Sequence, residues 1–123
     1  MKRLALILLP LALLGCSDSG KVKDREWTQI LTRKDGVVTY ARKPQSESKS
    51  LKKAWVKDVN KDGAYSVGLW AFDCKANKMG ILANYVYGKD SKKGAESGGE
   101  RPRVEFVHII PDTNGETLRD YAC

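Results

Sequence analysis

Three cysteines are the most reactive side chains of this 123-residue sequence, and the first of them has a distinctive setting. Cys16 ends the run Leu13-Leu14-Gly15-Cys16, which follows a cationic start, Met1-Lys2-Arg3, and an apolar stretch over residues 4–14. Such a start and stretch are typical of an export signal. In a lipoprotein signal, the small glycine gives a peptidase access to the backbone, and the cysteine thiol forms a thioether with diacylglycerol. The spacing therefore predicts a signal peptide over residues 1–15 and lipidation of Cys16; an ordinary signal peptide with an incidental cysteine is the alternative.

The apolar stretch is too short to span a membrane. Its 11 residues would cover about 16 Å as a helix, roughly half of the hydrocarbon core of a bilayer. We therefore expect a permanent anchor made of acyl chains, palmitate among them. An aspartate after the cysteine favours retention in the inner membrane, so Ser17 indicates the outer membrane and leaves open which of its faces the protein occupies. Residues 16–25 are expected to form the lipidated N-terminus and a flexible tether.

The other two cysteines, Cys74 and Cys123, would then lie in a compartment that oxidises thiols. An even number favours one disulfide, and closing a loop of about 50 residues would contribute up to roughly 4 kcal/mol to stability. A bridge between two chains through the terminal Cys123 is the alternative. Metal or haem attachment would need a Cys-x-x-Cys motif or paired Cys and His residues, and the single histidine, His108, supplies neither. The sequence thus predicts no cofactor.

Groups suited to catalysis are few. His108 falls within a predicted strand without a Ser or Cys nucleophile motif, and Glu96 and Glu100 belong to a long loop that cannot hold a catalytic geometry. Residues 58–63 match the first half of a calcium-binding loop, but position 12 is Leu69, where a bidentate glutamate is needed. We expect a hairpin turn at residues 58–63, no metal and no enzymatic activity.

The remaining pattern predicts a mainly β domain over residues 26–123. Short runs rich in Val, Ile, Tyr and Trp alternate with Gly, Asn, Asp and Lys, and Asp35-Gly36 is typical of a hairpin turn. Residues 65–74 carry large apolar side chains on both faces, which indicates a central strand covered on both sides. The 16 residues 88–103 are expected to be a loop. The six expected strands span residues 27–32, 37–41, 51–59, 64–74, 79–87 and 104–110.

The end of the chain predicts a short helix. Thr113 and Glu116 have the spacing of a capping box, in which the Thr113 hydroxyl meets the Glu116 amide. A helix of two turns is not stable alone, so tying Cys123 to Cys74 would dock it on the sheet. The expected buried side of the helix consists of Leu118, Tyr121 and Ala122.

Charge is the remaining general feature. The sequence has 22 Lys and Arg residues against 15 Asp and Glu, a net charge of +7, which becomes +5 without residues 1–15. A domain this small buries only about two-thirds of its unfolded surface, which argues against a large active-site cleft. Export argues against nucleic acid, so the expected anionic partner is an acidic host protein, a glycosaminoglycan or lipopolysaccharide phosphates; a merely solvated surface is the alternative. The cations of this predicted cationic patch fall in two loops: Lys49, Lys52 and Lys53 at one loop edge, and Lys89, Lys92, Lys93, Arg101 and Arg103 in the long loop 88–103.

A series of marker residues runs through the predicted domain. They are Trp27 with Ile30, Val38-Thr39-Tyr40, Trp55-Val56-Lys57, the strand over residues 69–74 ending in Phe72-Asp73-Cys74, Tyr85, Ile110-Pro111 and the closing residues 118–123. In this order they resemble the surface-adhesin protein E family of bacterial lipoproteins over about the whole mature domain. The resemblance implies an α+β fold: a curved six-stranded antiparallel sheet with a short C-terminal helix docked on its concave face by a Cys74–Cys123 disulfide.

The same resemblance implies a function. It predicts a non-enzymatic outer-membrane lipoprotein that binds host extracellular-matrix or plasma proteins and forms homodimers. The alternative is a lipoprotein that faces the periplasm and has a structural or envelope-maintenance role. Exposure of the domain on intact cells would separate the two functions.

Overall fold

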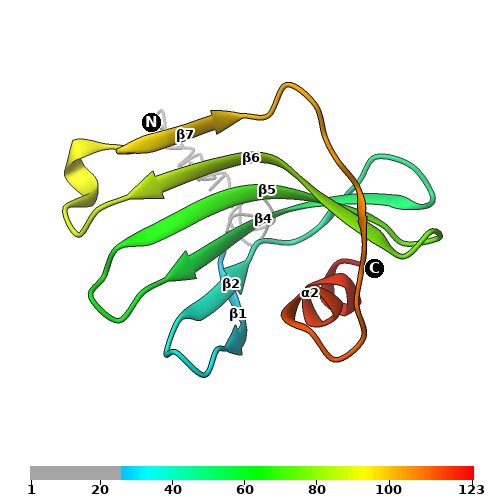
Figure 1. Cartoon of the computed structure of the whole chain (residues 1–123), viewed down its shortest axis with the longest axis horizontal. Helices are drawn as coiled ribbons and strands as arrows, with labels where there is room; N and C mark the ends of the chain where they lie inside the picture. The colour runs from blue at the N-terminus through cyan, green and yellow to red at the C-terminus, as the bar shows by residue number, and fades with distance from the viewer. Residues whose placement is uncertain (1–25) are drawn as a thin grey trace, which may run out of the picture.

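The structure of this chain, a computed structural model, describes residues 26–123 (Figure 1). The predicted signal peptide, the lipidation of Cys16 and the tether therefore lie outside the described residues. No helix of residues 26–123 is both long and apolar enough to cross a membrane.

Most of the described chain forms one antiparallel sheet. Its central path runs in the order β1-β2-β4-β5-β6-β7, while β3 pairs with β4 and β8 pairs with β6 (Figure 1). Consecutive long strands are joined by hairpins, and a long segment after β7 crosses the sheet to the α-helix α2. The elements are β1 (Thr28–Thr32), β2 (Val38–Ala41), β3 (Gln45–Ser46), β4 (Leu51–Val59), β5 (Tyr65–Asp73), β6 (Lys78–Tyr87), the 3-10 turn η1 (Ser91–Lys93), β7 (Ser97–Glu100), β8 (Val107–His108) and α2 (Asn114–Ala122).

The sheet of residues 26–123 has eight strands, so the prediction of six is wrong. Five of the expected strands are present, but the outermost strand on the β6 side is β7, which lies within the predicted loop 88–103. Its sequence, Ser-Gly-Gly-Glu, has no apolar alternation to reveal a strand. Gly98 allows the pairing because its φ is 122° and because a Cβ there would collide with the backbone of Asn84 and Tyr85.

The expected sixth strand over residues 104–110 is reduced to the two residues of β8. Only Val107 and His108 pair with β6, opposite Met79 and Lys78. Ile109 turns inward instead and is buried, and its N–H donates to the Asn77 carbonyl at 3.0 Å. The segment therefore serves mainly to place one apolar side chain between the sheet and the helix.

The core lies between α2 and one face of the sheet. Alternate residues of β4 and β5 point to this helix face, because side chains along a strand alternate between the two faces. Phe72 is fully buried there, with Leu118 and Ala122 of α2 packed in the same cluster. The other buried members of the cluster are Ala41, Ala54, Val56 and Ile109.

A disulfide within the chain joins Cys74, just after β5, to Cys123, which ends α2. The two Cα atoms are 5.8 Å apart, a usual separation for native bridges. The predicted pairing is confirmed, and it closes over a sequence separation of 49 residues. The terminal residue is thereby held against the end of a central strand.

The predicted capping box at the start of α2 is wrong. Thr113 does occupy the N-cap position, but its side chain makes no capping hydrogen bond. Its hydroxyl donates instead to the Ile110 carbonyl at 2.6 Å, which closes the turn that precedes the helix. The buried side is close to the prediction: Leu118 and Ala122 are buried, and Tyr121 packs against the core from a half-buried position.

Candidate binding face

The sheet face that points away from α2 carries most of the aromatic side chains. Residues directly opposite each other in an antiparallel pair share a face. Lys57 is opposite Tyr40 on one side and Val67 on the other, and Val67 is in turn opposite Tyr85. The open face, as we call it, consists of Trp27, Tyr40, Arg42, Trp55, Lys57, Tyr65, Val67, Tyr85 and Tyr87.

Side chains of the open face are only half-buried, in contrast to Val56 and Phe72 on the helix face. α2 packs on the opposite face, so within residues 26–123 no helix covers these rings. β5 is thus covered by α2 on one face, while on the other face its side chains are buried or partly buried without a helix over them. β5 is nevertheless central, because it pairs with β4 and β6 along its whole length.

Trp27 organises the charged part of the open face. The Arg42 guanidinium carbon lies 4.7 Å from the centroid of the Trp27 ring, and the Lys57 ammonium lies 4.6 Å from it. The same ammonium is 5.7 Å from the Tyr40 ring and 5.8 Å from the Tyr65 ring. These distances fall within the range of cation–π attraction, so three rings enclose the end of Lys57.

The two cations of the open face have no acidic partner in the described part of the chain. Neither Arg42 nor Lys57 forms an ion pair with a carboxylate of residues 26–123. Burial lowers the pKa of the Lys57 ammonium, and repulsion from the positive charge of Arg42 lowers it further. Within the same range, the buried Nε of Arg42 has no hydrogen-bond partner. This part of the surface would therefore be favourable for a negative group.

A pocket of about 280 Å³ opens beside these cations. Its lining combines aromatic rings, one aliphatic side chain and one guanidinium, and next to it the Tyr65 and Tyr87 rings stack at 4.7 Å between centroids. Sites for small molecules have this mixture of apolar walls and a few polar groups. The lining residues are Trp27, Arg42, Trp55, Val67, Tyr85 and Tyr87.

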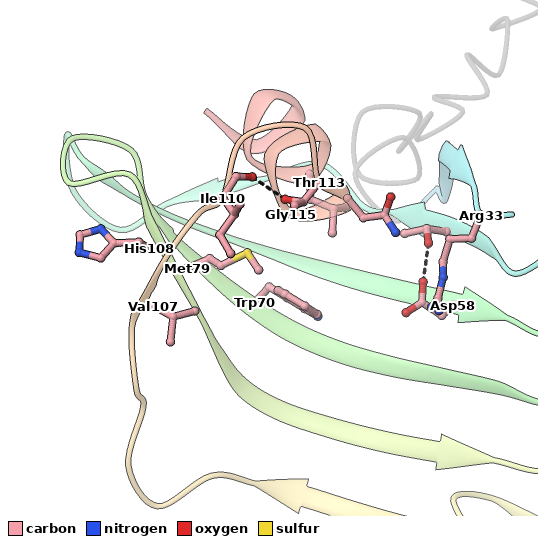
Figure 2. Close-up of a pocket in the computed structure, with 12 residues that line it drawn as sticks. Arg33, Asp58, Trp70, Met79, Val107, His108, Ile110, Thr113 and Gly115 are labelled. Carbon is pink, nitrogen blue, oxygen red and sulfur yellow. Dashed lines mark hydrogen bonds between the residues drawn. The ribbon is translucent and has the colours of Figure 1, made fainter. Parts of the chain in front are cut away.

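A second cavity, of about 460 Å³, lies between the sheet and α2 (Figure 2). Trp70, Met79 and Leu118 form much of its wall. The Asp58 carboxylate lies at one end of the cavity and accepts a hydrogen bond from the Thr39 hydroxyl at 2.5 Å. His108 lies at the other end and points outward, so its imidazole does not approach Asp58 (Figure 2). The His108 imidazole is therefore not placed next to the Thr39 hydroxyl or the Asp58 carboxylate (Figure 2).

The calcium-like segment forms a hairpin turn between β4 and β5. The Asp62 carboxylate accepts the Ala64 N–H at 2.9 Å, and the Gly63 N–H donates to the Asn60 carbonyl at 3.0 Å. Gly63 has φ of 93°, which suits glycine. Asp58, at the start of the segment, bonds to Thr39 on the helix face. Among residues 26–123, no three His, Cys, Asp or Glu side chains are grouped so that they could hold a metal ion.

The two groups of the predicted cationic patch lie in different parts of the sheet. Lys49, Lys52 and Lys53 lie at the end of the sheet where β4 begins, whereas Lys92 and Lys93 belong to η1 at the opposite end (Figure 1). The nine residues of β4 separate the two ends by about 30 Å. Lys89 is close to η1 in sequence, and Arg101 and Arg103 follow β7 along the edge.

Two of these lysines also have local partners. The Lys53 ammonium lies 3.2 Å from the Glu47 carboxylate, and the Lys52 ammonium donates to the Ser46 hydroxyl at 2.5 Å. Adjacent residues of one strand point to opposite faces, so Lys52 and Lys53 do not act together. The predicted cationic patch thus consists of two separate groups of lysines at the ends of the sheet, with two arginines along the β7 edge.

The open face was missed because its residues are spread over four strands. Trp55 and Lys57 are two residues apart in β4, and Tyr65 and Val67 are two residues apart in β5, so each strand does show the spacing of one shared face. What the sequence does not show is which face the helix covers. A signal was available in Ala54 and Val56, which are smaller than Trp55 and suit close packing under a helix.

Comparison with protein-family models, curated protein sequences and solved structures finds no match to this chain.

Proposed function

We propose that this chain is a lipid-anchored outer-membrane protein of the surface-adhesin protein E type and that its domain is a non-enzymatic binding module. The sequence supports the anchor through the order Leu, Leu, Gly, Cys before residue 17. An antiparallel sheet with a disulfide-held C-terminal helix is the kind of fold that the family resemblance implies. That agreement supports the assignment.

The observation that carries the binding role is the open face. Trp27, Trp55 and Tyr85 gather over adjoining strands around one pocket, and they are only partly buried because no helix of residues 26–123 lies over them. Aromatic side chains and arginine are enriched at interaction surfaces. In the cavity under α2, by contrast, the Thr39 hydroxyl donates to Asp58 and the His108 imidazole points away from both (Figure 2). Binding therefore explains the exposed residues better than catalysis does.

The partner expected from the resemblance is a host extracellular-matrix or plasma protein, with a second copy of the chain as an additional partner. Binding of a host protein requires the domain to be outside the cell. Protease treatment of intact cells, followed by blotting for the domain, tests this requirement. We expect the domain to be digested while a periplasmic marker stays intact.

Protection of the domain in intact cells, with digestion only after the outer membrane is permeabilised, would contradict the adhesin role. That result would favour the periplasm-facing structural or envelope-maintenance role. Antibody labelling of the same cells gives an independent readout that does not depend on protease sites. The permeabilised sample controls for a fold that resists protease.

A further inference from the structure

We propose that the open face binds an acidic saccharide, with a sugar ring in the Trp55 pocket and its carboxylate or sulfate beside Arg42 and Lys57. This inference rests on the proposed role of the open face as a binding surface. It assigns to that surface a class of ligand and the residues that recognise it. It does not use the predicted cationic patch, whose lysines lie at the ends of the sheet.

The pair of cations on the open face favours an anionic ligand. Arg42 and Lys57 lie over one ring, repel each other, and have no carboxylate partner within residues 26–123. An anion placed between them would relieve the repulsion and give both cations a partner. Arginine binds carboxylate and sulfate through paired N–H donors, and the unpartnered Nε of Arg42 supplies one of these donors.

The shape and chemistry of the pocket suit a sugar ring. The flat C–H faces of a pyranose ring stack on aromatic rings, and Trp27, Trp55, Tyr85 and Tyr87 all line the pocket. Its volume of about 280 Å³ is near the lower end for small-molecule sites, which suits one sugar unit and its substituents. The stacked Tyr65 and Tyr87 rings continue the aromatic surface, so neighbouring units of a chain could lie along the sheet.

Two other occupants fit less well. A second copy would bring Arg42 and Lys57 of both chains to one interface without acidic partners from the open face. A membrane surface would favour the most exposed apolar side chains, and these lie elsewhere: Val107 is 55% and Ile110 is 66% exposed, both on the segment that leads to α2. An acidic saccharide uses the cations and the half-buried rings together.

Calorimetric titration of the purified protein, with its disulfide intact, tests the proposal. The probes are a hyaluronan hexasaccharide, which carries carboxylates; a heparin hexasaccharide, which also carries sulfates; and cellohexaose, which is neutral. We expect at least one acidic probe to bind at least tenfold more tightly than cellohexaose. We also expect this binding to weaken as salt is added.

Variants locate the site. Arg42→Gln and, separately, Lys57→Gln should each weaken binding of the acidic probe about tenfold or more, because each removes a charge-assisted contact. Arg33→Gln removes one exposed charge from the turn between β1 and β2, and Lys92→Gln with Lys93→Gln removes two from η1; both should bind like the unaltered protein. Thermal melts check that each variant is folded.

Three results would overturn the proposal. The first is that neither acidic probe binds at millimolar concentration. The second is that folded Arg42→Gln and Lys57→Gln bind as well as the Arg33→Gln control. The third is that sedimentation shows the open face covered by a second copy, or flotation shows it bound to anionic vesicles, without saccharide binding. The assay is done in solution, so a failure here is distinct from protection of the domain in intact cells.

Discussion

Arg42 and Lys57 approach one aromatic ring, with the Arg42 Cζ 4.7 Å and the Lys57 Nζ 4.6 Å from the centroid of Trp27. The pair comes from neighbouring strands, since Arg42 follows β2 and its N–H donates to the Trp55 carbonyl of β4 at 2.9 Å. The ring stabilises both cations through its π-face, while their mutual repulsion remains uncompensated by any carboxylate of residues 26–123. This relationship gives the open face its combination of aromatic and positive character.

The lowered pKa of Lys57 predicts a pH dependence of stability. The folded protein holds this proton less tightly than the unfolded chain does, because of burial and the charge of Arg42. Between the lowered pKa and the ordinary lysine value, the unfolded chain binds more protons, so the free energy of unfolding should rise with pH across that interval. At pH values below this interval, Lys57 is charged in both states, and the full cost of holding the charge in the folded protein lowers the free energy of unfolding. NMR titration of the Lys57 side chain measures the pKa directly.

In Arg42→Gln, the Lys57 pKa should move upward, because the second cause of its lowering is removed. In Lys57→Gln, the unfolding free energy should no longer rise with pH through the titration of this residue. Lys34→Gln, at an exposed site, should keep the full rise. A Lys57 pKa at or above the ordinary lysine value would contradict the described environment.

The disulfide should account for the docking of α2. Replacing both cysteines, as Cys74→Ser with Cys123→Ser, should lower the free energy of unfolding by up to about 4 kcal/mol, because the unfolded chain loses a closed loop of this length. The nine-residue helix is too short to persist alone, so its amides should exchange faster than those of β5. Urea unfolding and amide exchange test both effects. Unchanged protection of α2 after the replacement would show that packing alone holds the helix.

A matched pair of valines tests which sheet face is covered. Val56 is 3% exposed on the helix face, and Val67 is half-exposed on the open face of the neighbouring strand. Val56→Ala should cost about 2 kcal/mol of unfolding free energy, through lost burial and a cavity, and Val67→Ala should cost less than half of that. Urea unfolding measures both. Equal costs would indicate that something covers the open face as tightly as α2 covers the other.

Gly98 should be required for β7. In Gly98→Ala, the new Cβ would meet the backbone of Asn84 and Tyr85 at a φ of 122°, so β7 should separate from β6 at a cost of about 1–3 kcal/mol. The amides of Glu96 and Arg101, which donate to Val86 and Leu82, should then exchange faster. Gly94→Ala is the control, since its φ is also positive but no atom lies within 4 Å of the added Cβ. Equal exchange in the two variants would argue against the close approach.

Lipidation of Cys16 is the prediction on which the anchor depends. Cells that express the full chain should incorporate labelled palmitate into it, and Cys16→Ala should abolish the label. Ser17→Ala is a matched neighbour that leaves the thiol in place and should keep the label. Labelling of the Cys16→Ala variant would contradict a lipobox that ends at this residue.

The sequence predicts the central strands and the Cys74–Cys123 disulfide better than the periphery of the fold. Asp35-Gly36 and the turn at residues 60–63 mark hairpins, because few residues adopt the required backbone angles, and β4 and β5 follow from the runs between such turns. Cys74 and Cys123 pair as expected because only two cysteines remain in the described chain.

β7 and the end of the predicted strand 104–110 depend on tertiary contacts. Gly98 and Gly99 have no strand propensity, and they pair because β6 offers an edge. Ile109 is buried through its place under α2, which no local pattern reveals. The open face was not predicted because it, too, depends on tertiary structure. The spacing in β4 places Trp55 and Val56 on opposite faces, but only the position of α2 decides which of them is buried.

Hydroxyl-radical footprinting with the acidic hexasaccharide that binds more tightly tests most directly whether the open face is the binding surface. Side chains on both faces react, so one experiment compares them. We expect protection at Trp27, Trp55 and Tyr85, with Trp70 and Met79 in the cavity under α2 unchanged. Protection of Trp70 and Met79 instead, or equal reactivity of the open-face rings with and without saccharide, would contradict it.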